Sequence, residues 1–468
     1  MSMKKITAIL LLFIFAAAAA SCSLFRPPVS SESESASGSG GEKPVETSHP
    51  ADLLREAQER IDAYRELDFA GKMVTVVCPF DSVDIYQPSE TDSSLASARV
   101  LRNMNVAGAV GVEFRVMYTR GDMAQEIRAT SDSGDFYADF VSLPQNRVGI
   151  MAKEGFLQDL VGLPYAAVRS DSYNNTAYSA SSPVYGVYGD FNFDPSYYNC
   201  VYINKSLCRE HGVDAGSLYS EGKWTVGEFL KILREFDGSL ENKYGFVWMS
   251  AELGSENRVT DLVYAAFGLK YMKADGDAFA DVLSSAAEDA AFAAREMISL
   301  RRLSVTDLIY DSDAFLRGDV CFYADSLGYS LSIPSSVEWG VLPIPSSDGG
   351  SAKTLLPATA GMLCMLKSAP TEACGAFLGA FASFSDGYIT AMFLRDVFSS
   401  SARTSAELSA IRDVMASGVC DLAFIMAPAY KFAAAASYGA VRSAVKSGRT
   451  IAEITDGVIG PANGELGG

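Results

Sequence analysis

Histidine is nearly missing from this chain of 468 residues, which contains only His49 and His211. So small a number excludes His-rich zinc sites and argues against Ser-His-Asp and Cys-His catalytic arrangements. The HExxH, GxSxG and GxxxxGK[ST] motifs of metalloproteases, hydrolases and nucleotide-binding proteins are also missing. No Cys-x-x-Cys spacing suggests a metal site. The sequence therefore gives little support to catalysis by these groups.

A surplus of basic residues is missing as well. The chain has 38 Lys and Arg against 57 Asp and Glu, a formal net charge of −19. Proteins that bind nucleic acid or an anionic lipid surface attract phosphates through excess Lys and Arg, so neither is expected as the main partner. The acidity is interpreted as an aid to solubility. With 49% hydrophobic residues, the chain is globular and long enough for two or three domains' worth of core.

The N-terminus has the pattern of a targeting segment. Lys4 and Lys5 precede an apolar run from Ile6 to Ala20, which is too short to span a membrane comfortably. The run ends in Ala-Ala-Ser before Cys22, similar to a lipobox but without its usual first Leu. We expect residues 1–21 to be a lipoprotein signal peptide and Cys22 to carry lipid, anchoring the protein at the extracytoplasmic side of the cell membrane. The alternative is ordinary secretion with an unmodified Cys22.

Residues 22–50 are rich in Ser, Gly, Glu and Pro, which is typical of a disordered tether. Seven cysteines remain besides Cys22, and an odd number outside the cytoplasm leaves at least one thiol unpaired. Four of them lie in apolar, strand-like runs and are predicted to be buried; they are Cys78, Cys200, Cys321 and Cys364. A bridge between Cys200 and Cys208 is conceivable, but their spacing does not argue for it.

The first part of the body alternates strand and helix patterns. Strands are predicted over 72–77, 112–118 and 136–143, and helices over 93–104 and 121–131. This alternation predicts βαβ crossovers and a parallel sheet. Ligands of open parallel sheets bind beyond the carboxyl ends of the strands, so the pattern points to the loops after Val77 and Val141.

A family resemblance is centred on residues 197–236. An aromatic and β-branched strand ends in Asn204-Lys205, a short helix over 206–211 is closed by Gly212, and Lys223-Trp224-Thr225 opens an amphipathic helix. This stretch resembles the family 1 extracellular solute-binding proteins, the carbohydrate-type receptors of bacterial ABC importers. The segments 316–323 and 339–345 are similar to strands of the same family.

The resemblance implies an α/β fold of the two-lobe type II periplasmic binding protein class, with discontinuous lobes joined by a multi-strand hinge. The first lobe would comprise 51–182 plus 355–388, and the second 183–354 plus 389–468. A first hinge strand is expected near 183–188 and a return crossing over 354–366. Further strands are predicted at 244–248 and 320–323, and helices over 255–303 and most of 388–468.

Candidate ligand-binding residues follow from these positions, because sugars are bound by aromatic faces together with carboxylates, amides and Arg. Asp81 and Asp84 follow the first strand, where they could instead be solvated or helix-capping residues. Gln145 and Asn146 follow the third strand, where they could form an ordinary turn. The hinge and second-lobe candidates are Tyr188, Asp190, Trp248, Glu252, Asp325 and Tyr329. Trp248 could equally be a core residue.

These features predict a monomeric receptor that captures a small solute, a sugar or an oligosaccharide, in an interlobe cleft and delivers it to an ABC transporter permease. Hinge closure around the ligand would need no catalysis, metal or cofactor. One alternative is a secreted glycan hydrolase, since a catalytic carboxylate pair needs only two of the 57 acids at a suitable separation. Another is a glycan-sensing lipoprotein of the same fold that serves no transporter.

Overall fold

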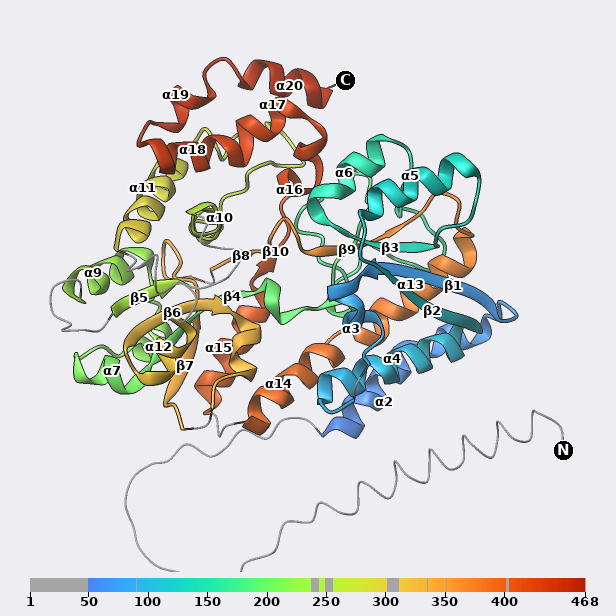
Figure 1. The fold of residues 1–468 in the computed structure, drawn as a ribbon, viewed down its shortest axis with the longest axis horizontal. Coiled ribbons are helices and arrows are strands. Elements are labelled where there is room, and N and C mark those ends of the chain that lie inside the picture. The colour runs from blue at the N-terminus through green and yellow to red at the C-terminus, as the bar shows by residue number, and fades with distance from the viewer. Residues whose placement is uncertain are drawn as a thin grey trace, which may run out of the picture. The chain divides into compact units, whose positions relative to one another are not determined.

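The computed structural model describes residues 49–89, 91–236, 244–248, 256–300, 311–334, 336–350, 352–400 and 404–467. The predicted signal peptide, Cys22, the tether up to residue 48, Glu252 and the side chain of Trp248 lie outside this description. The described residues contain two four-stranded sheets, one two-stranded sheet and the helices that cover them (Figure 1).

The first sheet has the order β2-β1-β3-β9. Its strands are β1 (Lys72–Pro79), β2 (Val112–Thr119), β3 (Phe140–Pro144) and β9 (Gly361–Met365). β1 runs parallel to β2 and β3, whereas β9 is antiparallel to β3. The predicted parallel arrangement is therefore confirmed for β1, β2 and β3, whereas β9 makes the sheet a mixed one. The third strand begins at Phe140 rather than at Phe136, whose side chain is 63% exposed.

Helices bury the apolar faces of this sheet. They are α2 (Pro50–Arg60), α3 (Val83–Tyr86), α4 (Ser94–Val110), α5 (Met123–Ser133), α6 (Gln145–Lys153), α13 (Thr371–Ser385) and α14 (Tyr388–Ser400). Ser93 caps α4 by accepting a hydrogen bond from Ala96 N at 3.0 Å, and Gly111 ends it with a φ of +71°. The span Thr371–Val397 is apolar enough to cross a membrane, but 72% of its most apolar window is buried, as in a core helix.

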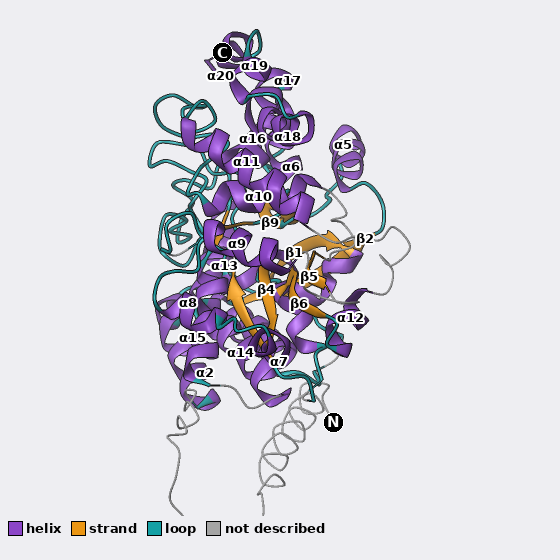
Figure 2. Ribbon diagram, turned by 90° about the vertical axis from the view of Figure 1, so that its left-hand side faces the viewer, coloured by secondary structure: helices purple, strands orange, loops and turns teal. Residues whose placement is uncertain are grey.

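The second sheet has the order β5-β6-β4-β7. Its strands are β4 (Asn199–Asn204), β5 (Tyr244–Trp248), β6 (Val320–Ser326) and β7 (Trp339–Pro343). Within this sheet β4 is antiparallel to both of its neighbours, β6 and β7, whereas β5 runs parallel to β6. Each of these strands was predicted within a few residues. In Figure 2 helices surround the strands of the fold.

Helices of the second sheet start and stop largely as the sequence indicates. They are α7 (Lys205–Glu210), α8 (Ala215–Ser220), α9 (Val226–Phe236), α10 (Glu256–Ala266), α11 (Ser285–Leu300) and α12 (Asp311–Arg317). Asn204 caps α7 through Leu207 N, and Gly212 follows it with a φ of +70°. The prediction that 255–303 is helical is confirmed for α10 and α11. It is wrong for 267–284, because Gly268, at a φ of +71°, follows α10 in the left-handed conformation and ends it.

The C-terminal part is helical, as predicted. Its helices after α14 are α15 (Ser405–Ala416), α16 (Leu422–Met426), α17 (Lys431–Ala434), α18 (Ala440–Ser447), α19 (Ile451–Thr455) and α20 (Ile459–Gly467). α14 packs against α4, whereas α15 packs against β7, so the chain passes from one sheet to the other between them. α6 packs against α16, and Gly149 lies so close that a Cβ there would be 2.4 Å from the carbonyl oxygen of Ile425.

The segments that join the two sheets contain little regular structure. The predicted hinge strand near 183–188 is reduced to one antiparallel bridge, in which Val187 and Leu363 exchange backbone hydrogen bonds of 3.0 and 2.9 Å. In the predicted return crossing, β8 (Thr354–Leu355) pairs in parallel with β10 (Gly418–Val419) before β9 begins. The lobe boundaries stay a prediction.

Candidate functional site

Two exposed aromatic side chains stand at the carboxyl ends of the parallel strands β1 and β2. Phe80 is 43% exposed and Tyr118 is 55% exposed, and their ring centroids are 5.2 Å apart in an edge-on arrangement. The Arg120 guanidinium lies 3.7 Å from the centre of the Phe80 ring. Aromatic surface held in place by a cation, at the edge where open sheets bind ligands, suits stacking against an apolar ligand face.

The loop after β1 continues with two predicted site residues, Asp81 and Asp84. Both are exposed. Asp84 Oδ1 accepts hydrogen bonds from Ser89 N at 3.2 Å and Ser89 Oγ at 3.5 Å, so this carboxylate closes its own turn, as the capping alternative suggests. Asp81 accepts a bond from its neighbour Ser82 at 3.4 Å. Asp81 is therefore the better placed of the two to meet a ligand.

Tyr197, which precedes β4, links this loop to the crossing between the sheets. Its hydroxyl accepts a hydrogen bond from Gly361 N at 3.3 Å, and Asn192 Nδ2 donates to Gly361 O at 2.8 Å. Burial raises the pKa of Tyr197, and the charges of Asp194 and Asp81 raise it further, while bonding to Gly361 and Ser82 opposes the rise. Asp81, Ser82 and Tyr197 thus come together where the chain enters the second sheet.

Gln145 and Asn146 begin α6 and attach it to the return crossing. Gln145 N donates to Ala360 O at 3.0 Å, and its side-chain Nε2 donates to Pro357 O at 2.9 Å. Asn146 N donates to Ala358 O at 3.1 Å. Gln145 is 0% exposed and Asn146 is half-buried. In this structure Gln145 therefore fixes a crossing segment and has no surface through which to contact a solute.

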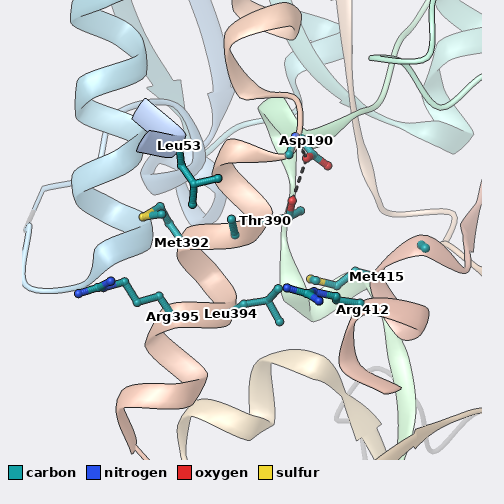
Figure 3. Close-up of a pocket in the computed structure, with 11 residues that line it drawn as sticks. Leu53, Asp190, Thr390, Met392, Leu394, Arg395, Arg412 and Met415 are labelled. Carbon is teal, nitrogen blue, oxygen red and sulfur yellow. Dashed lines mark hydrogen bonds between the residues drawn. The ribbon is translucent and has the colours of Figure 1, made fainter. Parts of the chain in front are cut away.

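Tyr188 and Asp190 lie in the first crossing but face different neighbours. Tyr188 is 1% exposed, with its ring 6.4 Å from that of Tyr197. Asp190 Oδ2 accepts hydrogen bonds from Gly387 N at 2.8 Å and Thr390 Oγ1 at 2.9 Å, at the start of α14 (Figure 3). Burial raises the pKa of Asp190 to about 6. This carboxylate faces a cavity of about 400 Å³ between α14 and α15 rather than the loop after β1.

Asp325 and Tyr329 lie together at the carboxyl end of β6. Asp325 accepts a hydrogen bond from Tyr323 OH at 3.0 Å and another from Ser326 N, and burial raises its pKa to about 6. The Tyr329 ring lies 5.0 Å from that of Tyr323. Trp248 ends β5 opposite Ala324 in parallel register, so its backbone is at the same sheet edge. The structure thus places three predicted site residues along one edge of the second sheet.

Sequence reasoning missed Phe80, Tyr118, Arg120 and Tyr197. The rule for parallel sheets points to the loop that contains Phe80, but the residues predicted to bind ligand in that loop were Asp81 and Asp84. Tyr118 was predicted only as the last residue of the second strand. Among the described residues, no group of three or more His, Cys, Asp or Glu is arranged to hold a metal ion.

Comparison with known proteins identifies what the chain is similar to. A family model of bacterial extracellular solute-binding proteins matches residues 109–383, which is more than half of the 468 residues. No curated protein sequence matches the chain.

Solved structures share the fold at low sequence identity. The sugar-binding protein MalE from Xanthomonas citri has a TM-score of 0.56 and 14% identity, covering 85% of this chain and 98% of its own. The cyclic alpha-maltosyl-1,6-maltose binding protein from Arthrobacter globiformis has a TM-score of 0.54 and 15% identity, covering 85% and 99%. The galacto-N-biose-/lacto-N-biose I-binding protein from Bifidobacterium longum has 0.52 and 13%, covering 85% and 98%. The predicted two-lobe α/β fold is confirmed.

Proposed function

The chain belongs to the bacterial extracellular solute-binding proteins, and from this premise we propose that its solute is a sugar or an oligosaccharide. The family places the protein outside the cytoplasm as a binder of solutes. The similar structures are named for sugars that they bind, which supports a carbohydrate ligand. Delivery to the permease of an ABC transporter is the corresponding biological role.

The main observation in support is the exposed pair Phe80 and Tyr118 with Arg120 beside it. A pyranose ring has an apolar face that packs on an aromatic ring, and its hydroxyl groups bond to carboxylates and guanidinium groups. Asp81 and Arg120 supply both kinds of group within one or two residues of the aromatic pair. The same end of the first sheet therefore offers apolar and polar contacts to one ligand.

Closure of the second lobe over this end is the proposed mechanical step. Ligand contacts that improve in the closed state shift the population toward it, and contacts that are equal in both states do not. Asp325, Tyr329 and the end of β5 are the second-lobe groups proposed to approach the ligand. The crossing at Tyr197 and Gly361 lies between the two sets and joins them.

A binding experiment tests the ligand class. The protein is screened against monosaccharides and oligosaccharides by thermal shift, and the affinity of each hit is measured by calorimetry. Tyr118→Ala is expected to weaken sugar binding about two- to twelvefold, because stacking contacts are worth about 0.5–1.5 kcal/mol. Phe136→Ala removes an equally exposed ring elsewhere and should leave the affinity unchanged. Equal affinities of Tyr118→Ala and the parent would rule out this aromatic site.

We also propose that Cys22 anchors the protein to the membrane by lipid after removal of residues 1–21, and that the protein acts as a monomer. Mass spectrometry of the mature N-terminus distinguishes lipidated Cys22 from an unmodified secreted form. An uptake assay in cells lacking the protein distinguishes transport from a sensing role. The glycan hydrolase alternative gains no support from the family match, which is to binding proteins.

A further inference from the structure

The thiols of Cys208 and Cys321 are in contact in the interior of the second lobe. Cys208 lies on α7 and Cys321 on β6, and their sulfur atoms are 3.6 Å apart. Both residues are buried, with 2% and 0% of their surfaces exposed. They are separated by 113 positions in the sequence, so the contact is a product of the tertiary fold.

Other buried thiols have different neighbours. The sulfur atoms of Cys78, Cys200 and Cys364 each lie 3.6 Å from a backbone carbonyl oxygen, those of Met117, Asp325 and Met362 respectively. Cys200 thus points toward β6 at Asp325, and Cys208 contacts Cys321. The structure therefore favours Cys321 as the partner of Cys208, rather than Cys200, which the sequence left open.

We propose that Cys208 and Cys321 form a disulfide bond when the protein folds outside the cytoplasm. That compartment is where disulfides form and persist, and the family assignment places the protein there. Sulfur atoms in a disulfide are about 2.05 Å apart, so they must approach by about 1.5 Å. Rotation about a Cα–Cβ bond moves a cysteine sulfur further than this.

The reaction needs an oxidant, which we assign to the class of thiol-oxidising proteins that carry a reactive disulfide. One cysteine thiolate attacks the oxidant's disulfide and forms a mixed disulfide, releasing one oxidant thiol. The second cysteine thiolate then attacks the protein-side sulfur, and the oxidant leaves as a dithiol. Both thiol protons are transferred to the oxidant's sulfurs through solvent, and its disulfide accepts the two electrons. Cys208 is among the residues that line a cavity of about 650 Å³ between α7, α8, β7 and α15.

The bond would fasten α7 to the centre of the second sheet. It would close a loop containing β5 and helices α8 to α12, and so reduce the conformational freedom of the unfolded chain. It would leave five other thiols besides Cys22. The first lobe would gain no equivalent crosslink, since Cys78, Cys364 and Cys374 have no sulfur neighbour recorded among the described residues.

Peptide mapping gives the direct test. The full chain is purified from the extracytoplasmic fraction of a bacterial host without reductant, and its thiols are blocked with N-ethylmaleimide under denaturing conditions. Trypsin should release peptide Ser206–Arg209 joined to Gly318–Lys353, two hydrogens lighter than their sum, and dithiothreitol should separate them. Complete blocking of Cys208 and Cys321, even after incubation with oxidised glutathione, would overturn the proposal, as would Cys208 joined to another cysteine.

Thermal unfolding provides a second readout with a matched control. Dithiothreitol should lower the Tm of the parent by about 5 °C, because it opens a long loop in the unfolded chain. Cys208→Ser should lack this response, whereas Cys200→Ser, which alters another buried thiol, should retain it. A parent Tm that does not respond to dithiothreitol contradicts the proposal. If Cys208→Ser fails to fold, Cys321→Ala replaces it, and the peptide map of the parent still decides.

Discussion

The two sheets differ at the edges where we propose that the ligand binds. At the first sheet, Phe80 and Tyr118 are about half exposed on a parallel edge, with Asp81 in the adjoining loop. At the second sheet, Asp325 and Tyr329 are held by Tyr323 and by the backbone of Ser326. Among the described residues, the exposed rings on the first edge have no internal hydrogen-bond partner, whereas the polar groups on the second edge already have such partners. If both edges bind the solute as proposed, we expect it to bind the first lobe before the second closes on it.

An arginine near each sheet makes a different kind of contact: Arg102 is buried, whereas the Arg442 side chain is 24% exposed. Arg102 of α4 is 0% exposed and donates to the carbonyl oxygens of Phe191 at 2.6 Å and Ile85 at 3.0 Å. Arg442 of α18 instead makes a two-pronged ion pair with Asp261 at 2.9 and 2.6 Å. Arg102 joins the crossing at Phe191 to α3 at Ile85 by donating to backbone carbonyl oxygens. Arg442 forms an ion pair with the Asp261 carboxylate. Substitutions of the two should therefore have different costs.

The largest effect is expected from Arg442→Met. It would leave Asp261, whose side chain is 5% exposed, as a buried charge without its ion-pair partner, and should lower the free energy of unfolding by about 3–5 kcal/mol. Urea unfolding measures this loss. Adding Asp261→Asn should restore most of it, because the buried charge is then removed. A double variant no more stable than Arg442→Met would show that packing of the arginine, and not charge pairing, stabilises the second lobe.

A smaller loss, about 2–3 kcal/mol, is expected for Arg102→Met. The methionine fills much of the space but leaves two buried carbonyl oxygens without their donor, while the desolvation cost of the guanidinium disappears. Urea unfolding is again the measurement, with Arg395→Met on the exposed surface of α14 as the control. A neutral Arg102→Met would mean that the crossing does not depend on these hydrogen bonds.

The free energy of unfolding should depend on pH through Asp325, which lies at the edge of the second sheet. Its folded pKa of about 6 lies above the ordinary value of 3.8, so the folded state favours the protonated acid. Stability from this group is present below pH 4 and is lost as the pH rises to about 6. Asp325→Asn cannot ionise, so its stability relative to the parent should improve by about 1–2 kcal/mol between pH 4 and pH 7.5.

Unfolding free energies at several pH values check this expectation. Asp84→Asn, in the exposed loop of the first lobe, removes the same charge and serves as the control for loss of a carboxylate. Parallel pH profiles of Asp325→Asn and the parent would mean that Asp325 ionises as freely as an exposed acid.

The smallest difference in stability is expected between substitutions of two helix caps, Ser93 of α4 and Asn204 of α7. Ser93→Ala removes the side-chain acceptor of Ala96 N at an exposed start of α4 and should cost about 0.5–1 kcal/mol. Asn204→Ala removes the buried cap of α7 and should cost about 1–2 kcal/mol, since a buried N–H then lacks its acceptor. Thermal unfolding of both variants gives the comparison, and equal losses would mean that burial does not matter at these caps.

Local patterns and the family resemblance were enough to predict β1 to β7 and the closing glycine of α7, whereas β9 was predicted only as part of the return crossing. They failed at 267–284, where one left-handed glycine outweighs the Ala-rich pattern around it. They could not show that Asp190 meets the start of α14, because the groups that bind it are almost two hundred residues away. The exposure of Tyr118 could not be predicted for a related reason: local sequence does not show which aromatic residues at a strand end face solvent.

The contact between Gly149 and Ile425 has a mechanical consequence. Main chain meets main chain there, in α6 of the first sheet and α16 of the C-terminal helices, with no side chain to act as a cushion. A single methyl group at residue 149 would work as a wedge between these helices. Gly149→Ala would therefore force α6 and α16 apart and change the angle between them.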